Sequence, residues 1–447
     1  MNKATRALII LTFLVPLWPA AAGRQAADPP ETLPFSFQEY RLRNGLRVIL
    51  SEDTRLPIVT VAVGYGAGTL REKPGQEGLA YLLENLMFQG SDNVSPLQHI
   101  VYVQKVGGEL NATTSPDKTL FYETLPSNQL ALALWLESDR MKSLAITPAS
   151  IGRTREELLS EHQGRLASDP YLESFSQFDM LLFPDVLYGH PLVGTGPGMA
   201  GLTEAAILEF HGTYYVPDNA VLCIVGNIDV ARTRELVARY FDTIAPGMDI
   251  PSPPRPVFTR ENDAVVRRIR LPAGNSGFHM GFRFFPVQPG DLDCLRILES
   301  LLLGGETSRL RSRLMRHDLT ARYLSGGLDV RMSVSTLKIF CLATNAVMIA
   351  RSEKAILSEV DRLKSNAVSQ DELNKARHRF KTDYLDRLST TLGKSLFLVD
   401  AVFSGRGLET LEGELARVLN VSPQTLVAFS SKYFIPQNRV VLEFGPQ

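Results

Sequence analysis

Features that decide the function of many other proteins are scarce in this sequence of 447 residues. The three cysteines, Cys223, Cys294 and Cys341, lie far apart in apolar surroundings, which excludes a Cys-x-x-Cys metal motif and a disulfide framework. We expect three buried thiols. A formal net charge of -1 gives no electrostatic basis for binding nucleic acid or an anionic membrane surface. After the N-terminus, no apolar run is long enough to span a bilayer.

The N-terminus has the pattern of an export signal. Lys3 and Arg6 form a basic start, and the apolar stretch at 7–18 is too short to cross a bilayer comfortably. Ala20–Ala22 offers a small-residue cleavage site. We predict that residues 1–22 are a signal peptide, removed on export to a bacterial periplasm or out of the cell, and that the mature protein has no membrane attachment. An uncleaved membrane anchor is the alternative.

The rest of the chain shows strand and helix patterns in turn. Gly45 lies in an Arg-Asn-Gly turn signal between two strand-like runs, which indicates a hairpin. The alternating apolar residues of 57–67 indicate a half-buried strand, and two more strands are expected around a turn at Ser115–Asp117. Later patterns predict helices at about 126–144, 147–166, 170–183, 203–215 and 230–242, and a buried strand at 220–226.

Two blocks of sequence occur twice, in the same order and at nearly the same spacing. Tyr214–Val221 matches Tyr433–Val440, and Leu82–Leu86 matches Ile297–Leu301. A repeat on this scale indicates two copies of one structural unit. We therefore predict an α+β fold made of two tandem, similar α/β units. Each unit is expected to be a mostly antiparallel sheet with helices packed on one face.

Prolines are concentrated between the two copies, at positions 246, 251, 253, 254 and 256. Such a density of proline prevents both helix and sheet and marks a linker. We predict an N-terminal unit at 36–243, a linker at 244–262 and a C-terminal unit at 263–447.

The stretch from Gly78 to Gly90 is the most informative. Its leucines recur at the spacing of one helix face, and Tyr81, Glu84 and Asn85 fall on the opposite face. One class of peptidases uses a helix with the order His-x-x-Glu-His, in which the histidines bind zinc and the glutamate activates water. Here the order is Tyr-x-x-Glu-Asn, so the glutamate is present and both histidines are absent.

The context Gly-Leu-Ala-x-Leu-Leu-Glu-x-Leu-Met-Phe-x-Gly resembles the metal-site helix of the inverzincins, the family of pitrilysin, insulinase and mitochondrial processing peptidase. The resemblance covers almost the whole mature chain and implies an active site in a chamber between two similar halves. It also implies that Glu161 occupies the position of the family's third zinc ligand, a glutamate on a later helix. Tyr81 and Asn85 depart from the family, since a protonated phenol and an amide are poor zinc ligands. A catalytic zinc needs three protein ligands, so we predict a degenerate metal site at Tyr81, Glu84, Asn85 and Glu161, with no metal in this chain.

The second half carries another element of the same family. Gly304–Leu310 and the residues after it resemble the segment from which an arginine and, seven residues later, a tyrosine reach the substrate. Arg316 and Tyr323 match these two, and such side chains can donate hydrogen bonds to a carbonyl or oxyanion. The match needs one extra residue between Leu310 and Arg316, so Arg313 remains a competing candidate. An ordinary surface arginine and core tyrosine are the alternative.

The strand that contains Asn111, Ala112 and Thr113 also matches the family. There the resemblance implies an exposed edge strand to which the substrate adds as a further β-strand. Backbone pairing of this kind binds extended, unfolded peptides with little side-chain selectivity. The alternative is an edge strand without a ligand.

The loss of both histidines, together with a match at Arg316 and Tyr323, resembles one arrangement of the family, in which two related chains pair. One chain brings zinc and the other brings the arginine and tyrosine. We therefore predict the non-metal subunit of an exported heterodimeric zinc metallopeptidase, inactive alone, which binds unfolded peptides and whose partner carries zinc in an intact His-x-x-Glu-His motif. The alternatives are a non-catalytic peptide-binding or structural scaffold protein of the same fold and a divergent active metallopeptidase.

Overall fold

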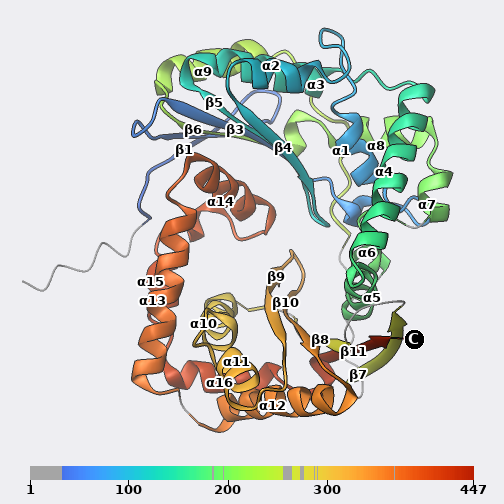
Figure 1. Ribbon diagram of the computed structural model, residues 1–447. Coiled ribbons are helices and arrows are strands. Elements are labelled where there is room, and N and C mark those ends of the chain that lie inside the picture. Colours follow the sequence, from blue (N-terminus) through green and yellow to red (C-terminus); the bar gives the residue numbers. More distant parts are fainter. Residues whose placement is uncertain are drawn as a thin grey trace, which may run out of the picture.

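The structure is a computed structural model that describes residues 33–446, apart from residues 184–185, 195, 255–263, 272–275, 286, 289 and 367. The predicted signal peptide and part of the predicted linker lie outside the described residues. None of the helices in the described part of the chain combines the length and the apolar character that a membrane span needs. The described residues form a six-stranded and a five-stranded sheet, which lie one above the other in Figure 1.

The N half, from β1 to α9, contains the six-stranded sheet in the order β1-β2-β6-β3-β5-β4. Its strands are β1 (Gln38–Arg41), β2 (Arg47–Glu52), β3 (Ile58–Tyr65), β4 (Glu109–Thr114), β5 (Thr119–Pro126) and β6 (Ala220–Gly226). Its helices are η1 (Thr69–Arg71), α1 (Leu79–Leu86), α2 (Gln98–Lys105), η2 (Ser127–Gln129), α3 (Leu130–Lys142), α4 (Pro148–Ser168), α5 (Leu172–Leu182), α6 (Val186–Gly189), α7 (Gly196–Gly201), α8 (Glu204–Tyr214), η3 (Pro217–Asn219) and α9 (Val230–Phe241).

The C half, from β7 to β11, contains the five-stranded sheet in the order β7-β11-β8-β10-β9. Its strands are β7 (Val265–Leu271), β8 (Ser276–Phe284), β9 (Tyr323–Val330), β10 (Ser335–Ala343) and β11 (Arg439–Pro446). Its helices are α10 (Asp291–Leu303), α11 (Arg309–Arg311), η4 (Ser312–His317), α12 (Ala346–Ser365), α13 (Gln370–Arg387), α14 (Thr391–Phe403), η5 (Leu408–Thr410), α15 (Glu414–Leu419), α16 (Pro423–Tyr433) and η6 (Pro436–Asn438).

Apart from β1, which extends the first sheet beyond β2, the two sheets have the same topology, which confirms the predicted fold class. In each sheet the last strand of the half pairs in parallel with one neighbour, as β6 pairs with β2 and β11 with β7. The other neighbouring strands are antiparallel, and each order ends on the first strand of a hairpin, β4 or β9. The predicted hairpin at Gly45 and the strand pair around Ser115–Asp117 are also present. The predicted boundaries of the two units and of the linker stay predictions.

The repeated Tyr-x-x-Pro-x-Asn block performs the same task in both halves. The side-chain amide of Asn219 donates to the backbone carbonyl of Tyr214 at 2.7 Å, and that of Asn438 donates to the carbonyl of Tyr433 at 2.9 Å. The prolines open the short helices η3 and η6, which lead directly into β6 and β11. The block therefore fixes how the chain passes from a helix into the last strand of each half.

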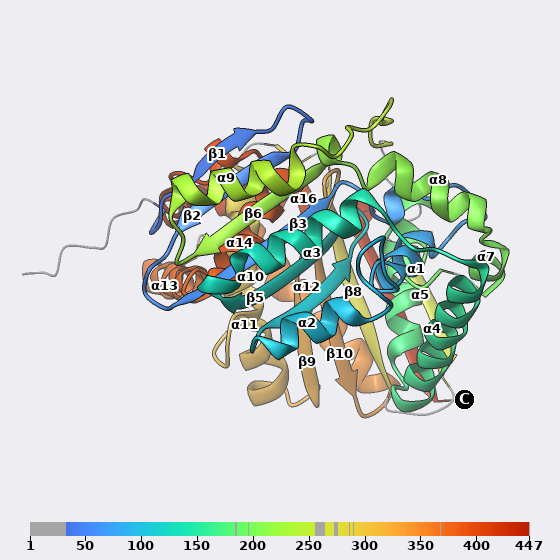
Figure 2. The same cartoon turned by 90° about the horizontal axis from the view of Figure 1, so that it is seen from above.

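Both faces of the first sheet are covered, and β6 shows why its sequence is apolar throughout. Leu222 and Ile224 face a core shared with α1, α3 and α9, whereas Val221, Cys223 and Val225 face a second core. A strand that is buried on both faces has a continuous apolar run rather than an alternating one. Figure 2 shows α2, α3 and α9 across the outer face. The three cysteines are free and buried, as predicted.

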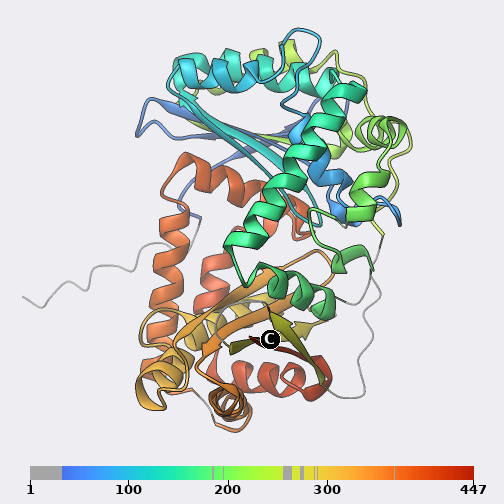
Figure 3. The same cartoon turned by 45° about the vertical axis from the view of Figure 1, so that its right-hand side comes forward.

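The inner face of each sheet is covered by a helix from the other half. Helix α14 of the C half packs on β3 and β6, with Phe397 and Val399 in the shared core. Helix α5 of the N half packs on β8 and β11, with Phe178 and Leu182 beside Leu442. Figure 3 shows α4 and α5, in green, crossing from the upper to the lower sheet. The predicted packing on one face therefore describes each unit's own helices, and the exchanged helices complete the other face.

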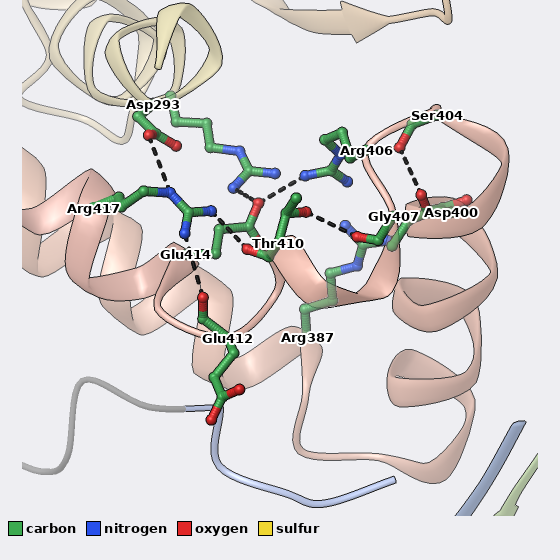
Figure 4. Close-up of polar contacts among 12 residues, drawn as sticks. Asp293, Arg387, Asp400, Ser404, Arg406, Gly407, Thr410, Glu412, Glu414 and Arg417 are labelled. Carbon is green, nitrogen blue, oxygen red and sulfur yellow. Dashed lines mark hydrogen bonds and ion pairs between the residues drawn. The ribbon is translucent and has the colours of Figure 1, made fainter. Parts of the chain in front are cut away.

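A cluster of arginines and carboxylates fixes the chain between α14 and α15 (Figure 4). The buried carboxylate of Glu414 accepts hydrogen bonds from Arg296 on α10 and, at 2.7 Å, from Arg406. Arg417 forms an ion pair with Asp293 at 3.6 Å. Because a buried carboxylate is costly without partners, the two arginines are needed to keep Glu414 inside. The cluster ties the end of the exchanged helix back to the C half.

Candidate functional site

Gly78 caps the start of helix α1, and its φ of 96° suits glycine. The buried carboxylate of Glu72 accepts hydrogen bonds from the backbone N–H groups of Gly78 at 2.9 Å and Ala80 at 2.8 Å, which satisfies two donors at the start of the helix. The leucines of α1 are buried against the first sheet. Burial raises the pKa of Glu72 to about 8. The predicted motif helix is therefore present and firmly anchored.

The two positions that would hold the zinc-binding histidines carry groups with other contacts. The side-chain amide of Asn85 donates to the backbone carbonyl of Tyr81 at 2.9 Å, one turn earlier in the same helix. Tyr81 is half-buried, and burial, with the charges of Glu161 and Glu84, raises the pKa of its phenol. Glu161 is exposed on α4, a helix that packs against α1. The four positions predicted as a degenerate metal site therefore lie on two helices that contact each other.

Glu84 is buried and already has a partner. Its carboxylate accepts a hydrogen bond from the hydroxyl of Thr114, the last residue of β4. Burial raises the pKa of Glu84, and hydrogen bonds from the side chain and backbone of Thr114 oppose the rise. A zinc ion does not fit these residues, because a phenol and an amide that donates to its own helix stand where two imidazoles are needed.

The predicted peptide-binding residues lie on an edge strand. Strand β4 ends the sheet order, with Asn111 and Thr113 exposed and Ala112 half-buried. The backbone N–H of Ala112 donates to the side-chain oxygen of Asn111 at 2.8 Å, so this N–H points away from β5. Residues on the same side of the strand as Ala112 therefore turn their backbone groups outward, where an added strand would pair with them.

The predicted arginine lies in η4, a π-helical segment. The backbone N–H of Asp318 donates to the carbonyl of Arg313, five residues earlier, at 2.9 Å. A π-turn holds one residue more than an α-turn, which is how a helix accommodates a single insertion. This agrees with the extra residue that the family match required before Arg316. Helix α11 continues directly into this wider turn, and the inserted residue supports Arg316 over Arg313.

Arg316 and Tyr323 are accessible but stand apart from α1. The side chain of Arg316 is 50% exposed and lies 3.4 Å from Glu306, whereas Arg313 pairs with Asp318 at 2.6 Å. Tyr323 starts β9, is 49% exposed and meets Phe340 edge-to-face at 6.0 Å. Among the described residues, neither side chain forms a hydrogen bond, ion pair or ring contact with α1. Helices α1 and α11 are well separated in Figures 1 and 2.

Comparison with known proteins assigns the family. Residues 47–171 match the family described as insulinase (peptidase family M16), and residues 201–380 match its "Peptidase M16 inactive domain". The chain belongs to the insulinase family. This confirms the predicted resemblance.

Proteins similar to this chain include a zinc protease, PqqE, of Helicobacter pylori, which is 23% identical over 88% of this chain and 89% of its own length. The β subunit of the mitochondrial processing peptidase of Blastocladiella emersonii is 27% identical over 53% of this chain and 51% of its own. A crystal structure of a protease from Helicobacter pylori superposes with a TM-score of 0.86 at 22% identity, covering 92% of this chain and all of the other. At this identity the structural likeness shows the fold alone.

Sequence reasoning missed two contacts of this insulinase-family site. Thr114, the partner of Glu84, could have been identified from the sequence, because it directly follows the predicted peptide-binding residues. Glu299 is the repeat equivalent of Glu84, and its carboxylate accepts the backbone N–H of Leu328 at 2.9 Å. The match of Leu82–Leu86 with Ile297–Leu301 was the signal that could have pointed to it.

A separate buried cluster offers possible metal ligands away from α1. His99, Glu123 and Glu137 place ligand atoms within 4.8 Å of one another. The imidazole of His99 lies 3.0 Å from the carboxylate of Glu123, and Glu137 accepts two hydrogen bonds from the guanidinium of Arg140. Because the guanidinium already neutralises Glu137 and repels a further cation, we interpret this cluster as a structural network.

Proposed function

We propose that this insulinase-family chain is the non-metal subunit of an exported heterodimeric zinc peptidase. One observation carries the proposal. The helix that would hold zinc has a phenol at one histidine position and an amide at the other, while the side chains of Arg316 and Tyr323, in the C half, are about half exposed. A subunit that had lost every role in catalysis would have no need to keep these donors accessible.

The proposed partner is a related chain with an intact His-x-x-Glu-His motif and a bound zinc ion. Helix α11, which leads into the turn with Arg316, and β9, which begins at Tyr323, lie apart from α1 in Figures 1 and 2, which supports the use of the two side chains at the site of another chain. A guanidinium and a phenol can donate to oxyanion charge as it develops on the scissile carbonyl. The open side of β4 would bind the unfolded peptide through backbone hydrogen bonds.

Copurification from the native host tests the pairing. The expected result is a complex in which a related chain with the intact motif binds zinc and the complex cleaves an unfolded substrate, whereas this chain alone holds well under one zinc ion and is inactive. Stoichiometric zinc and peptidase activity in the isolated chain would instead support a divergent metallopeptidase. Substrate binding without cleavage in every complex would support a peptide-binding scaffold.

Restoring the histidines tests the assignment of the degenerate metal site. Tyr81→His together with Asn85→His should raise zinc affinity, because Glu161 would then complete a set of three ligands. Glu161→Ala in the same background is the matched control and should remove the gain. If the double variant binds no more zinc than the parent chain, the assignment of Glu161 or of this helix face is wrong.

A further inference from the structure

The internal repeat places two carboxylates at equivalent positions on the central helices of the two halves. Glu84 on α1 aligns with Glu299 on α10. The positions equivalent to Tyr81 and Asn85 carry Arg296 and Ser300, so the C half has no metal ligands there. A role that Glu84 shares with Glu299 is therefore a role that needs no metal.

Both carboxylates bind the edge strand of their own sheet. Glu84 accepts the hydroxyl of Thr114 at the end of β4, and Glu299 accepts the backbone N–H of Leu328 on β9 at 2.9 Å. Thr114 lies on the same side of its strand as Ala112, whose N–H points outward. An edge strand is held by one neighbour only and opens easily, so a contact from a buried helix restrains it.

The two edges differ in what they leave free. On β9, Glu299 occupies the outward N–H of Leu328, and the guanidinium of Arg311 donates to the outward carbonyl of Leu324 at 3.1 Å. On β4, within the described residues, the contacts made by the outward side are those of Glu84 with Thr114 and of Asn111 with the neighbouring Ala112. The edge of β9 is therefore blocked by two side chains from its own half, whereas the middle of β4 remains open.

We propose that Glu84, at the position of the family's catalytic glutamate, is a positioning residue for peptide binding in this chain. It holds the end of β4 against α1, so that the outward backbone groups before Thr114 stay aligned for an added strand. This inference rests on the proposed function, since it assumes that β4 receives the peptide. Glu299 has the same restraining role on an edge that is closed to peptides.

Two substitutions of Glu84 separate this role from acid–base chemistry. Glutamine keeps an oxygen that can accept the hydroxyl of Thr114, whereas alanine does not. Binding is measured with fluorescein-labelled β-casein, an unfolded polypeptide, on the full chain, and the order of β4 is measured by hydrogen–deuterium exchange. Glu84→Ala should weaken binding roughly 5- to 10-fold, the effect of one lost hydrogen bond, and should speed exchange in β4. Glu84→Gln should stay within about twofold of the parent chain on both measures.

Glu299→Ala is the matched control, because it removes the equivalent carboxylate. It should speed exchange in β9 and leave the affinity for β-casein unchanged. In the active complex, Glu84→Ala should raise KM and leave kcat nearly unchanged, and Glu84→Gln should restore KM.

Three outcomes bear on the inference in different ways. Unchanged binding and unchanged exchange in Glu84→Ala would overturn it, and so would a Glu84→Gln complex that loses turnover as fully as the alanine variant. If the parent chain binds no β-casein, the proposed function of β4 fails. The exchange of β4 in the alanine and glutamine variants then still decides whether Glu84 restrains the strand.

Discussion

The two halves hold each other's exchanged helix by different chemistry. On the N half, the ammonium group of Lys394 on α14 meets the carboxylate of Asp53 at 2.6 Å, and both side chains are buried. On the C half, the imidazole of His279 stacks on Phe178 of α5 at 4.9 Å and hydrogen-bonds to Ser174 at 2.8 Å. The first contact is a buried ion pair, whereas the second is formed by a neutral imidazole, an aromatic ring and a hydroxyl.

The difference shows that a repeated backbone does not require repeated contacts. The strand order and the asparagine that leads into the last strand recur in both halves, whereas the side chains that fix the exchanged helices do not. The candidate site is asymmetric in the same way, since the N half offers an open edge strand and the C half offers Arg316 and Tyr323. The following predictions test how far each half depends on its own chemistry.

The largest effect is expected at the buried ion pair. Asp53→Ala leaves the ammonium group of Lys394 buried without its partner, which typically costs about 3–5 kcal/mol of the free energy of unfolding. Urea unfolding of the full chain measures this loss. Asp383→Ala is the matched control, because its pair with Arg379 is about half exposed and should contribute about 0–1 kcal/mol. Equal losses of stability in the two variants would contradict the interpretation that the ion pair of Asp53 and Lys394 holds α14 on the N half.

The next largest effect is expected in the C half, at the proposed hydrogen-bond donor Arg316. In a complex with the proposed zinc-bearing partner, Arg316→Ala should lower peptide hydrolysis roughly ten- to a hundredfold, since a lost charge-assisted hydrogen bond costs about 1.5–3 kcal/mol in the transition state. The dimer should remain intact, because the side chain is 50% exposed and its contact with Glu306 is long.

Arg313→Ala is the control for the position of the arginine. Its guanidinium pairs with Asp318 within the same segment, so the variant should keep its turnover. Loss of turnover in Arg313→Ala but not in Arg316→Ala would place the functional arginine one turn earlier. Full turnover in both variants of an active complex would favour the scaffold alternative.

The sequence was sufficient to predict most of the fold, because its signals were local. Proline and glycine marked turns, and apolar spacing gave most strands and helices of the N half. Helix α2 was missed, since its centre, Ile100–Val103, is a run of β-branched and aromatic residues that is typical of a strand. The exchange of α5 and α14 could not be predicted, because a buried helix face has the same pattern whichever sheet it meets.

The candidate site was predicted in part for the same reason. Family spacing pointed to Tyr81 and Asn85 on one helix and Glu161 on a later helix, and in the structure these helices, α1 and α4, contact each other. The partner of Glu84 required knowledge of which strand end reaches α1, which no local pattern contains. The π-helical turn that contains Arg316 was indicated in the sequence by one extra residue, although its form was visible only in the structure.

Acid should weaken the contacts that hold α5 and α14 over different ranges of pH. Burial, with the positive charge of Lys338, lowers the pKa of His279 to about 3. The unfolded chain takes up this proton near pH 6.5 and the folded chain does not, so stability is lost as pH falls from about 6.5 to about 3. Hydrogen bonds from Arg55 and Lys394 hold the pKa of Asp53 below its usual range, so that contact weakens only below about pH 4.

The measurement is the free energy of unfolding at several pH values between 7 and 4. His279→Phe removes the titrating group and keeps a ring beside Phe178, while the hydroxyl of Ser174 keeps its bond to the carbonyl of Tyr171 at 2.7 Å. The variant should lose less stability on acidification, by at most about 1.4 kcal/mol per pH unit. His211, whose pKa burial lowers to about 4, should maintain part of the slope. An unchanged slope would show that the second contact does not depend on a neutral His279.

The smallest effect is expected at Tyr323. Tyr323→Phe removes one neutral hydroxyl and keeps the ring that meets Phe340 edge-to-face at 6.0 Å. A neutral hydrogen bond contributes about 0.5–1.5 kcal/mol, so turnover of the complex should fall by roughly two- to tenfold, less than for Arg316→Ala. Stability should not change, because the side chain is 49% exposed. Steady-state kinetics should show the loss in kcat rather than in KM, since the hydroxyl is expected to meet charge that develops only in the transition state. A change confined to KM would mean that Tyr323 binds the peptide in its ground state, and the functional difference between the halves would then rest on Arg316 alone.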